Sequence, residues 1–119
     1  MWIVAKIKTN NFNIFSKNFK EKLNEVNFYF PKIKEKEINK NLLGNYVFCY
    51  HKLFSDTNFK LSLNYIKGLE YFLNCDFTNQ QEIIKFISYC KHHEDQSGFI
   101  KNSFFKEKLS KNGKFICGP

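Results

Sequence analysis

The run of residues 42–50 constrains the fold of this chain more than any other segment, because a turn there leads directly into an aromatic strand. Gly44 and Asn45 form the turn, since these residue types adopt positive φ at little cost. Side chains alternate between the two faces of a strand. The aromatic side chains on one face are Tyr46, Phe48 and Tyr50. Val47 and Cys49 make the other face apolar as well, so the strand is either central in a covered sheet or presents one face to a partner.

Hydrophobic periodicity along the rest of the chain predicts an alternation of strands and helices. The expected strands are residues 2–8, 28–31, 46–51 and 69–73. The expected helices begin after Asn10 or Asn11, after one of the residues 56–58, and at Thr78. The charged residues 32–41 are expected to form an exposed hairpin arm. This order predicts an α+β, ferredoxin-like fold with an antiparallel four-stranded sheet flanked by helices, in which residues 46–51 pair beside the first strand.

Length and composition point to a small domain without a membrane partner. A chain of 119 residues is long enough to bury a core without metal or disulfide support. It has no apolar run near the roughly 20 residues that span a bilayer. The N-terminus carries no secretion signature. We therefore expect a cytoplasmic protein.

Cysteine and histidine usage predicts neither a metal nor a catalytic site. The four cysteines are widely separated and are expected to be reduced thiols, with Cys49 in the core. Cys90, His92 and His93 lack a second pair of ligands at a suitable spacing, so we expect no metal and no cofactor. The sequence contains no glycine-rich phosphate loop and no recognisable nucleophile–base pair, and an enzyme is not expected.

The net charge of +8 favours a polyanionic partner. All 19 basic residues are lysines, and the absence of arginine removes the preferred bidentate reader of guanine. Phosphate contact with little base discrimination is the expectation. The abundance of Lys, Asn, Phe and Ile also matches AT-rich codon usage, so the alternative that these lysines only solvate the surface stays open.

Four segments, in order along the chain, resemble the N-terminal (NGN) domain of the NusG and RfaH family of transcription elongation factors. They are residues 2–4, 26–31, 42–50 and 67–73. The third is similar to the family's Leu-Phe-Pro-Gly/Asn-Tyr-Val/Leu-Phe-Val pattern, with Gly44 in place of the proline. Residues 108–119 resemble the start of the family's KOW barrel, but Pro119 comes too early to complete one, so we expect a fragment. The resemblance divides the chain into an NGN-like domain at 1–92 and a linker with a truncated barrel start at 93–119.

The resemblance implies a monomeric factor that binds the clamp helices of the largest RNA polymerase subunit and modulates pausing, processivity, termination or antitermination. The residues that it assigns to the polymerase contact are Lys6, Leu42, Leu43, Gly44, Tyr46 and Phe48. Those that align with a contact to the gate loop of the other large subunit are Phe59, Lys60 and Leu61, although the His-Thr-Thr run expected there is absent.

Contact with upstream or non-template DNA is expected on a separate set of residues. Lys8 and Lys67 align with DNA-facing positions of the family. Lys17 and Lys20 are added for their charge, and Asn11 for an amide that can reach base edges.

An RNA-binding module is the alternative, because ferredoxin-like sheets with exposed aromatic residues also stack bases. Tyr46 and Phe48 fit that interpretation too. The module's Lys/Arg-Gly-Phe-Gly-Phe-Val-x-Phe pattern is missing from the strand, whereas the elongation-factor interpretation accounts for four segments. The sequence therefore favours the elongation factor.

Overall fold

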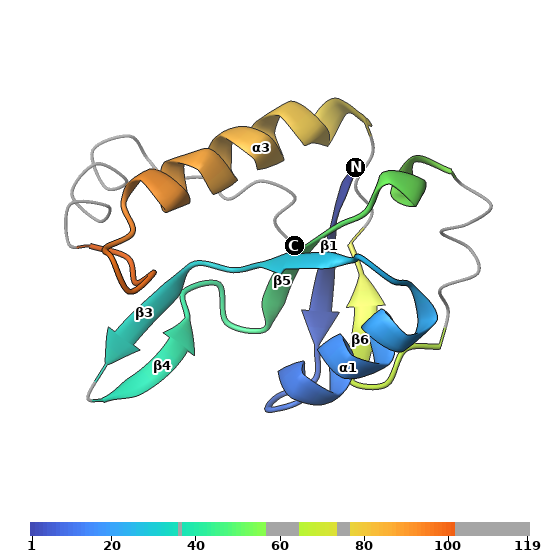
Figure 1. Ribbon diagram of the computed structural model, residues 1–119, viewed down its shortest axis with the longest axis horizontal. Helices are drawn as coiled ribbons and strands as arrows, with labels where there is room; N and C mark the ends of the chain where they lie inside the picture. Colours follow the sequence, from blue (N-terminus) through green and yellow to red (C-terminus); the bar gives the residue numbers. More distant parts are fainter. Residues whose placement is uncertain (36, 57–64, 74–76, 102–119) are drawn as a thin grey trace.

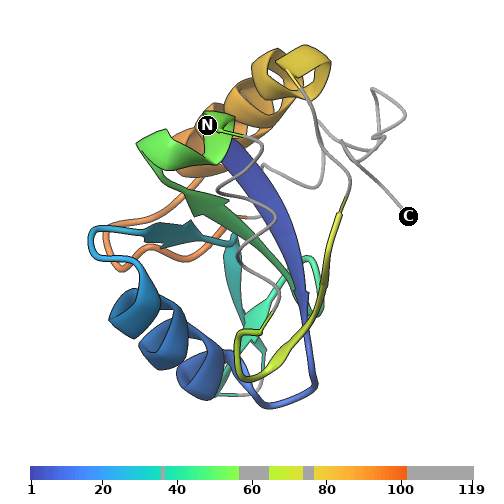
Figure 2. The same ribbon diagram turned by 90° about the vertical axis from the view of Figure 1, so that its right-hand side faces the viewer.

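The computed structural model describes residues 1–35, 37–56, 65–73 and 77–101, which form an antiparallel sheet with a helix on each face (Figure 1). The strands are β1 (Trp2–Ile7), β2 (Asn27–Tyr29), β3 (Lys32–Glu35), β4 (Ile38–Asn41), β5 (Tyr46–Tyr50) and β6 (Leu69–Phe72). The helices are α1 (Phe12–Lys22), the short 3-10 helix η1 (Lys52–Ser55) and α3 (Phe77–His92). Figure 2 shows α1 and α3 on opposite sides of the sheet.

β5 lies inside the four-stranded sheet, whose strand order is β2-β5-β1-β6. All neighbouring strands are antiparallel, with Val4 opposite Phe48 and Phe28 opposite Cys49. The prediction that the aromatic strand pairs beside the first strand, in the middle of the sheet, is confirmed. The α+β class is also as predicted, and the strand order is compatible with a ferredoxin-like arrangement.

The first core lies between α1 and one face of the sheet. Phe15 and Phe19 are fully buried there against the side chains that β1 directs to this face, Ile3, Ala5 and Ile7. Leu23 continues this apolar stripe at helical spacing and is also buried, although α1 ends one residue earlier. Leu23 has an extended backbone, and its N–H donates to the carbonyl of Phe19 at 2.8 Å. The buried apolar residues therefore extend one position beyond the C-terminal end of α1.

The second core lies between α3 and the opposite face of the sheet. Ile83, Phe86, Ile87 and Cys90 are buried at helical spacing against Val4 and Phe48. Ile84 on the same helix is 49% exposed, whereas Phe86 is buried in this core. α3 begins at Phe77, so Thr78 lies inside the helix and is not its predicted cap.

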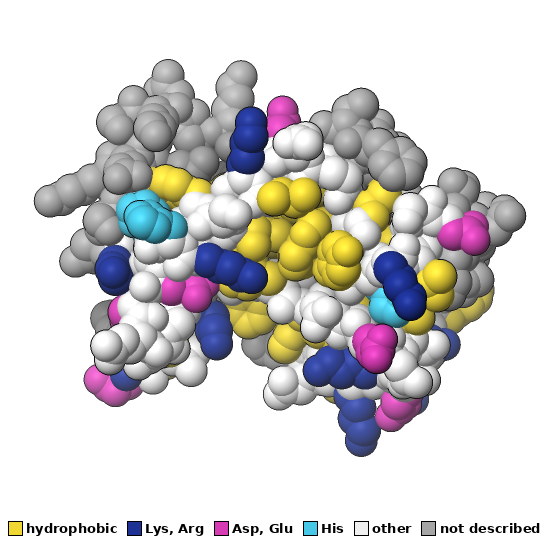
Figure 3. All heavy atoms as spheres, turned by 45° about the horizontal axis from the view of Figure 1, so that its top comes forward, with side chains coloured by type: hydrophobic (Ala, Val, Ile, Leu, Met, Phe, Trp, Pro, Cys, Tyr) yellow, Lys and Arg dark blue, Asp and Glu magenta, His cyan; other side chains and the backbone are white. Residues whose placement is uncertain are grey.

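Hydrophobic side chains also gather on the surface of this side of the molecule, with charged groups around them (Figure 3). Some residues packed against the second core are only partly buried, among them Trp2, Leu43, Tyr46 and Tyr89. The second core therefore reaches the surface at its margins.

The predicted arm is a two-stranded hairpin, β3–β4, with Lys32 opposite Asn41 and Glu35 opposite Ile38. It projects away from the sheet, as Figure 1 shows. Most of its side chains are exposed, including Ile38 at 60%. The charged, mixed sequence thus identified an exposed hairpin correctly.

Residues 93–101, in the segment whose sequence predicts the start of a linker, fold back onto the domain. His93 is only 5% exposed, and its carbonyl accepts a hydrogen bond from the N–H of Lys101 at 2.7 Å. The N–H of Ile100 donates to the carbonyl of Lys32 at 2.8 Å. Asp95 Oδ1 accepts from the N–H groups of Ser97 and Phe99 at 2.8 and 3.0 Å. We call this segment the 93–101 turn.

Some predicted features fall outside the described residues. These are most of the helix expected before Gly68 and the segment 108–119 that resembles a barrel start. In the part of the chain that the structure describes, no helix is both long enough and apolar enough to cross a membrane.

Candidate protein-docking surface

Two tyrosines flank the ammonium group of Lys6 on the face of the sheet that α3 covers in part. Lys6 lies on β1 opposite Tyr46 of β5 and opposite Tyr71 of β6. Lys6 Nζ is 5.8 Å from the ring centroid of Tyr46 and 5.7 Å from that of Tyr71. Both distances are within the range of cation–π attraction. The central position of β1 therefore brings one cation and two aromatic rings together.

Lys6, Tyr46 and Tyr71 contact one another and stay partly exposed. A hydrogen bond between the hydroxyl groups of Tyr46 and Tyr71, with a smaller effect of burial, raises the pKa of Tyr46. Lys6 Nζ lies 3.8 Å from Glu70 Oε2, and the two side chains are 31% and 47% exposed. A pair this exposed contributes little free energy. The Lys6 charge thus stays accessible to a partner.

The turn before β5 adds two leucines to the same side of the sheet. Asn41 organises this turn, since its Oδ1 accepts from the N–H of Leu43 at 2.8 Å and its Nδ2 donates to the carbonyl of Tyr46 at 2.7 Å. Gly44 has φ +70°, as the Gly-Asn pair predicted. Leu42 and Leu43 are half-buried against the second core. We call Lys6, Leu42, Leu43, Tyr46 and Tyr71 the Lys6 surface.

Phe48 does not belong to this surface, although the resemblance assigned it to the polymerase contact. Its side chain is 3% exposed, and its ring centroid lies 6.0 Å from that of Phe86 on α3. Trp2 packs edge-on against the same ring, with centroids 6.4 Å apart. Phe48 shares the sheet face of Tyr46, as alternation predicted, but α3 covers this position. It is a core residue in this structure.

The predicted nucleic-acid residues separate into two places. Lys8, Asn11 and Lys67 come together where β1 ends, α1 begins and β6 approaches. The N–H of Lys8 donates to the carbonyl of Gly68 at 2.9 Å, next to Lys67. Lys17 and Lys20 lie on α1, with Lys20 Nζ 5.6 Å from the ring centroid of Phe28. The predicted gate-loop residues Phe59, Lys60 and Leu61 lie outside the described residues.

Tyr71 and Glu70 are members of the site region that sequence reasoning missed. The strand at residues 69–73 was predicted, but the pairing register shifts within it: Tyr71 lies opposite Lys6 and Leu69 opposite Ile7, so Glu70 is left without a pairing partner on β1. Only the sheet order shows that β6 lies beside β1, which brings Tyr71 to Lys6. Among the described residues, no group of three or more His, Cys, Asp or Glu side chains could hold a metal ion.

Comparisons with known proteins do not assign this chain to a family. The sequence matches no protein-family model, and no curated protein is significantly similar to it. The functional argument therefore rests on the residues themselves and on their arrangement.

Proposed function

We propose that the protein is a transcription elongation factor of the NusG/RfaH type, which docks the Lys6 surface on the clamp helices of the largest RNA polymerase subunit. The observation that carries this proposal is the half-exposed aromatic and aliphatic group around Lys6, at the positions that the family resemblance assigns to the polymerase contact. Lys6, Leu42, Leu43, Gly44 and Tyr46 retain this role. Phe48 supports the surface from beneath.

The composition of the Lys6 surface supports docking to a protein. Aromatic residues are enriched at the centres of protein interfaces, and a few of them supply most of the binding energy. Both tyrosine rings lie within cation–π distance of Lys6, and such pre-ordered side chains lose less entropy on binding. A lysine between them adds one positive charge that selects a partner with an acidic group at the matching position.

Docking would act on transcription through a conformational equilibrium of the polymerase. A ligand shifts such an equilibrium only by the difference between its affinities for the two states. A factor that binds the closed clamp more tightly than the open one therefore disfavours paused states and raises processivity. No covalent step by this chain is required, and no cofactor enters the proposal.

A weak, salt-dependent contact with upstream or non-template DNA belongs to the same proposal. Lys8, Asn11 and Lys67 form one cluster that can meet phosphates together. Lys17 and Lys20 extend the positive charge along α1. Each phosphate that is neutralised steepens the dependence of log affinity on log salt by about 0.7 to 0.9.

The polymerase contact is tested by substituting Tyr46 with alanine and measuring binding to a purified clamp-helix fragment. Tyr46 is half-buried at the surface, so the variant should stay folded. Loss of an interface aromatic commonly costs about 2 kcal/mol, and we expect binding at least tenfold weaker. Tyr65→Ala is the matched control, because Tyr65 is 86% exposed and lines a separate hollow beside α1.

Two outcomes would remove the proposal. If Tyr46→Ala binds the clamp fragment as tightly as the wild type, the assigned surface is wrong. If Tyr65→Ala weakens binding equally, the clamp fragment binds exposed tyrosines nonspecifically and not the Lys6 surface. Phe48→Ala is unsuitable as a binding variant, because emptying a buried phenylalanine site typically costs about 3 to 5 kcal/mol of stability.

The arrangement of the helices favours protein docking over the RNA-binding alternative. Base stacking on a sheet requires a bare face with exposed rings. Here α1 covers one face and α3 covers much of the other, and Phe48 is buried beneath α3. Tyr46 and Tyr71 remain accessible only beside that helix. A full stacking platform is therefore not available on the described sheet.

A further inference from the structure

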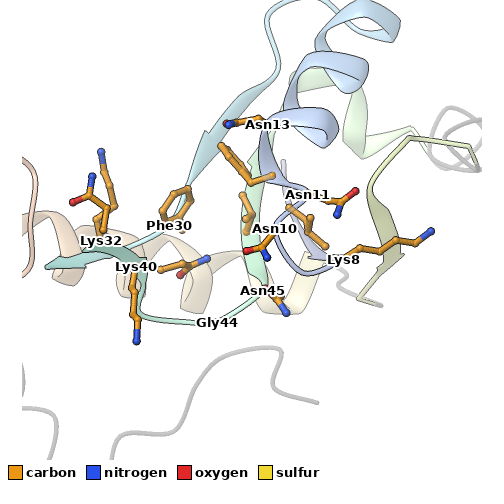
Figure 4. Close-up of a pocket in the computed structure, with 14 residues that line it drawn as sticks. Lys8, Asn10, Asn11, Asn13, Phe30, Lys32, Lys40, Gly44 and Asn45 are labelled. Carbon is orange, nitrogen blue, oxygen red and sulfur yellow. The ribbon is translucent and has the colours of Figure 1, made fainter. Parts of the chain in front are cut away.

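A cavity of about 440 Å³ lies on the hairpin side of the molecule, apart from the Lys6 surface (Figure 4). Its walls come from three segments that are distant in sequence: the β1–α1 connection, the β3–β4 hairpin and the turn before β5. The volume is within the range of small-molecule sites, about 300 to 1,000 Å³. Lys8 and Asn11 of the proposed DNA contact and Gly44 of the proposed polymerase contact are among its lining residues.

The base of the cavity is apolar and partly aromatic. Phe12 and Phe30 line it, with ring centroids 5.3 Å apart in an edge-to-face arrangement. Both rings are only half-buried, so part of each remains accessible. Ile7 and Val47 complete this floor from the sheet. A flat aromatic ligand could pack here, since exposed aromatic rings stack on nucleobases irrespective of base identity.

Six asparagines surround this floor, and they divide into two groups of three. The side-chain amides of the first group make hydrogen bonds within the protein. Asn11 and Asn45 bond to Thr9, and Asn41 bonds to Leu43 and Tyr46. Asn10, Asn13 and Asn39 are exposed, and none of their side chains makes a hydrogen bond within the described residues. Each such amide offers both a donor and an acceptor. The wall therefore presents paired hydrogen-bonding groups to a ligand.

The rim of the cavity is positively charged. Lys8, Lys32 and Lys40 line it, and no acidic residue among the described ones does. Lys40 reaches Glu35 at 3.3 Å, but both side chains are about half exposed, which makes this pair weak. Figure 4 shows the three ammonium groups directed outward from the cavity, toward solvent. An anionic group at the mouth could be reached by rotation of these long side chains.

We propose that this cavity binds a nucleotide unit. Its base packs on Phe12 and Phe30, the amides of Asn10, Asn13 and Asn39 meet the polar edge of the base, and Lys32 contacts its phosphate. Amide side chains supply the donors and acceptors that base edges require. The unit comes from a free mononucleotide or from a residue of a single strand. This inference deepens the DNA contact of the proposed function and rests on it in part, because Lys8 and Asn11 belong to both, but it requires no polymerase.

The experiment is a titration of the whole chain, followed by the NMR signals of the asparagine side-chain amides. The probes are the four ribonucleoside monophosphates, a nucleoside, inorganic phosphate and a short single-stranded oligonucleotide, at about 0.05 M salt to limit screening. We expect saturable shifts at Asn10, Asn13 and Asn39 with at least one mononucleotide, at a Kd of about 1 mM or tighter. An oligonucleotide that binds at least tenfold tighter identifies the strand as the source, and equal affinity identifies the free nucleotide.

Lys32→Glu tests whether the rim contacts the phosphate. It should weaken nucleotide binding about tenfold, since an attraction is replaced by a repulsion. Lys85→Glu on α3 is the matched control, with the same change in net charge on an exposed residue outside the cavity, and should change binding less than twofold. Asn39→Asp should weaken binding without disturbing the hairpin, because its amide makes no protein hydrogen bond there.

Three results would overturn the inference. They are the absence of saturable shifts with every nucleotide, identical shifts with inorganic phosphate alone, and an equal loss in Lys85→Glu and Lys32→Glu. Neither cavity variant alters the Lys6 surface, so binding to the clamp fragment should be unchanged in both. Failure of nucleotide binding therefore leaves the docking proposal standing, and failure of docking leaves the cavity intact.

Discussion

Gly68 directly precedes the edge strand β6 and packs against the start of α1, where no side chain fits. Its φ is +79°, and a Cβ atom there would lie 3.0 Å from the carbonyl oxygen of Asn11 and 3.2 Å from Cβ of Phe15. We expect Gly68→Ala to lower the free energy of unfolding by about 2 kcal/mol or more, because strain in φ and steric overlap add. Urea denaturation measures the change.

Gly44 provides the control for this substitution. Its φ is +70°, but a Cβ atom there would meet nothing within 4 Å. Gly44→Ala should therefore cost only the conformational part, about 1 kcal/mol. Equal losses in the two variants would mean that the contact between Gly68 and α1 carries no energy of its own.

Tyr46 and Phe48 show how far a residue's role can be predicted from its position in a strand. Alternation placed both rings on one face of β5, and this is confirmed. Their different burial arises from α3, a helix that follows 30 or so residues later and crosses over Phe48 but not Tyr46. No local pattern in residues 42–50 contains that information. The shared face of the two rings was predictable, whereas the burial of Phe48 was not.

The 93–101 turn illustrates the same limit for a whole element. Its polar sequence predicted a linker, because polar segments without periodicity are usually loops. Asp95 instead satisfies two backbone N–H groups, and Ile100 extends the backbone bonding to Lys32. By contrast, α1 and β1 were predictable because their apolar residues repeat at the periods of a helix and a strand. Elements that are held by hydrogen bonds to distant residues show no comparable periodicity in the sequence.

One side-chain contact ties this turn to the edge strand β2. Tyr29 Oη donates to Glu94 Oε2 at 2.5 Å, and Lys91 Nζ lies 5.3 Å from the centroid of the same ring. Burial and the hydrogen bond to Glu94 raise the pKa of the Tyr29 hydroxyl. We expect Tyr29→Phe to weaken the turn by about 1 kcal/mol, the usual net worth of a hydrogen bond.

Amide hydrogen exchange measures this effect where it occurs. The amides of Ile100 and Lys101 should exchange about fivefold faster in Tyr29→Phe, because local opening then exposes them more often. Tyr50→Phe is the control, since Tyr50 lies on β5 and is 38% exposed. Unchanged exchange at both amides would show that the backbone hydrogen bonds alone hold the turn.

At the scale of the whole molecule, two cores share one sheet. Successive residues of β1 enter opposite cores, with Ile3 and Ala5 facing α1 and Val4 facing α3. β5 behaves in the same way, with Cys49 in the first core and Phe48 in the second. Because both central strands are covered on two sides, a disturbance at either strand reaches both helices. Stability should then respond to single buried groups in the centre of the sheet.

Cys49, in the centre of the sheet, should make the free energy of unfolding depend on pH. Complete burial raises the pKa of its thiol from the ordinary value of 9.0. Above pH 9 the unfolded chain loses this proton while the folded chain keeps it, so the free energy of unfolding falls as the pH rises, by at most about 1.4 kcal/mol per pH unit. Below pH 9 the thiol is protonated in both states and contributes no slope.

Urea denaturation of the wild type and of Cys49→Ala between pH 8 and pH 11 tests this prediction, with pH values chosen around the ordinary 9.0 of the thiol. Alanine leaves a small cavity, which lowers stability by the same amount at every pH. The difference between the two proteins should therefore shrink as the pH rises above 9, because only the wild type carries the thiol penalty. Tyr29 has its pKa raised from 10.0 and keeps some slope in the variant, which Tyr29→Phe removes. Parallel curves for the wild type and Cys49→Ala would mean that the thiol ionises equally well in the folded chain, and that the centre of the sheet admits water.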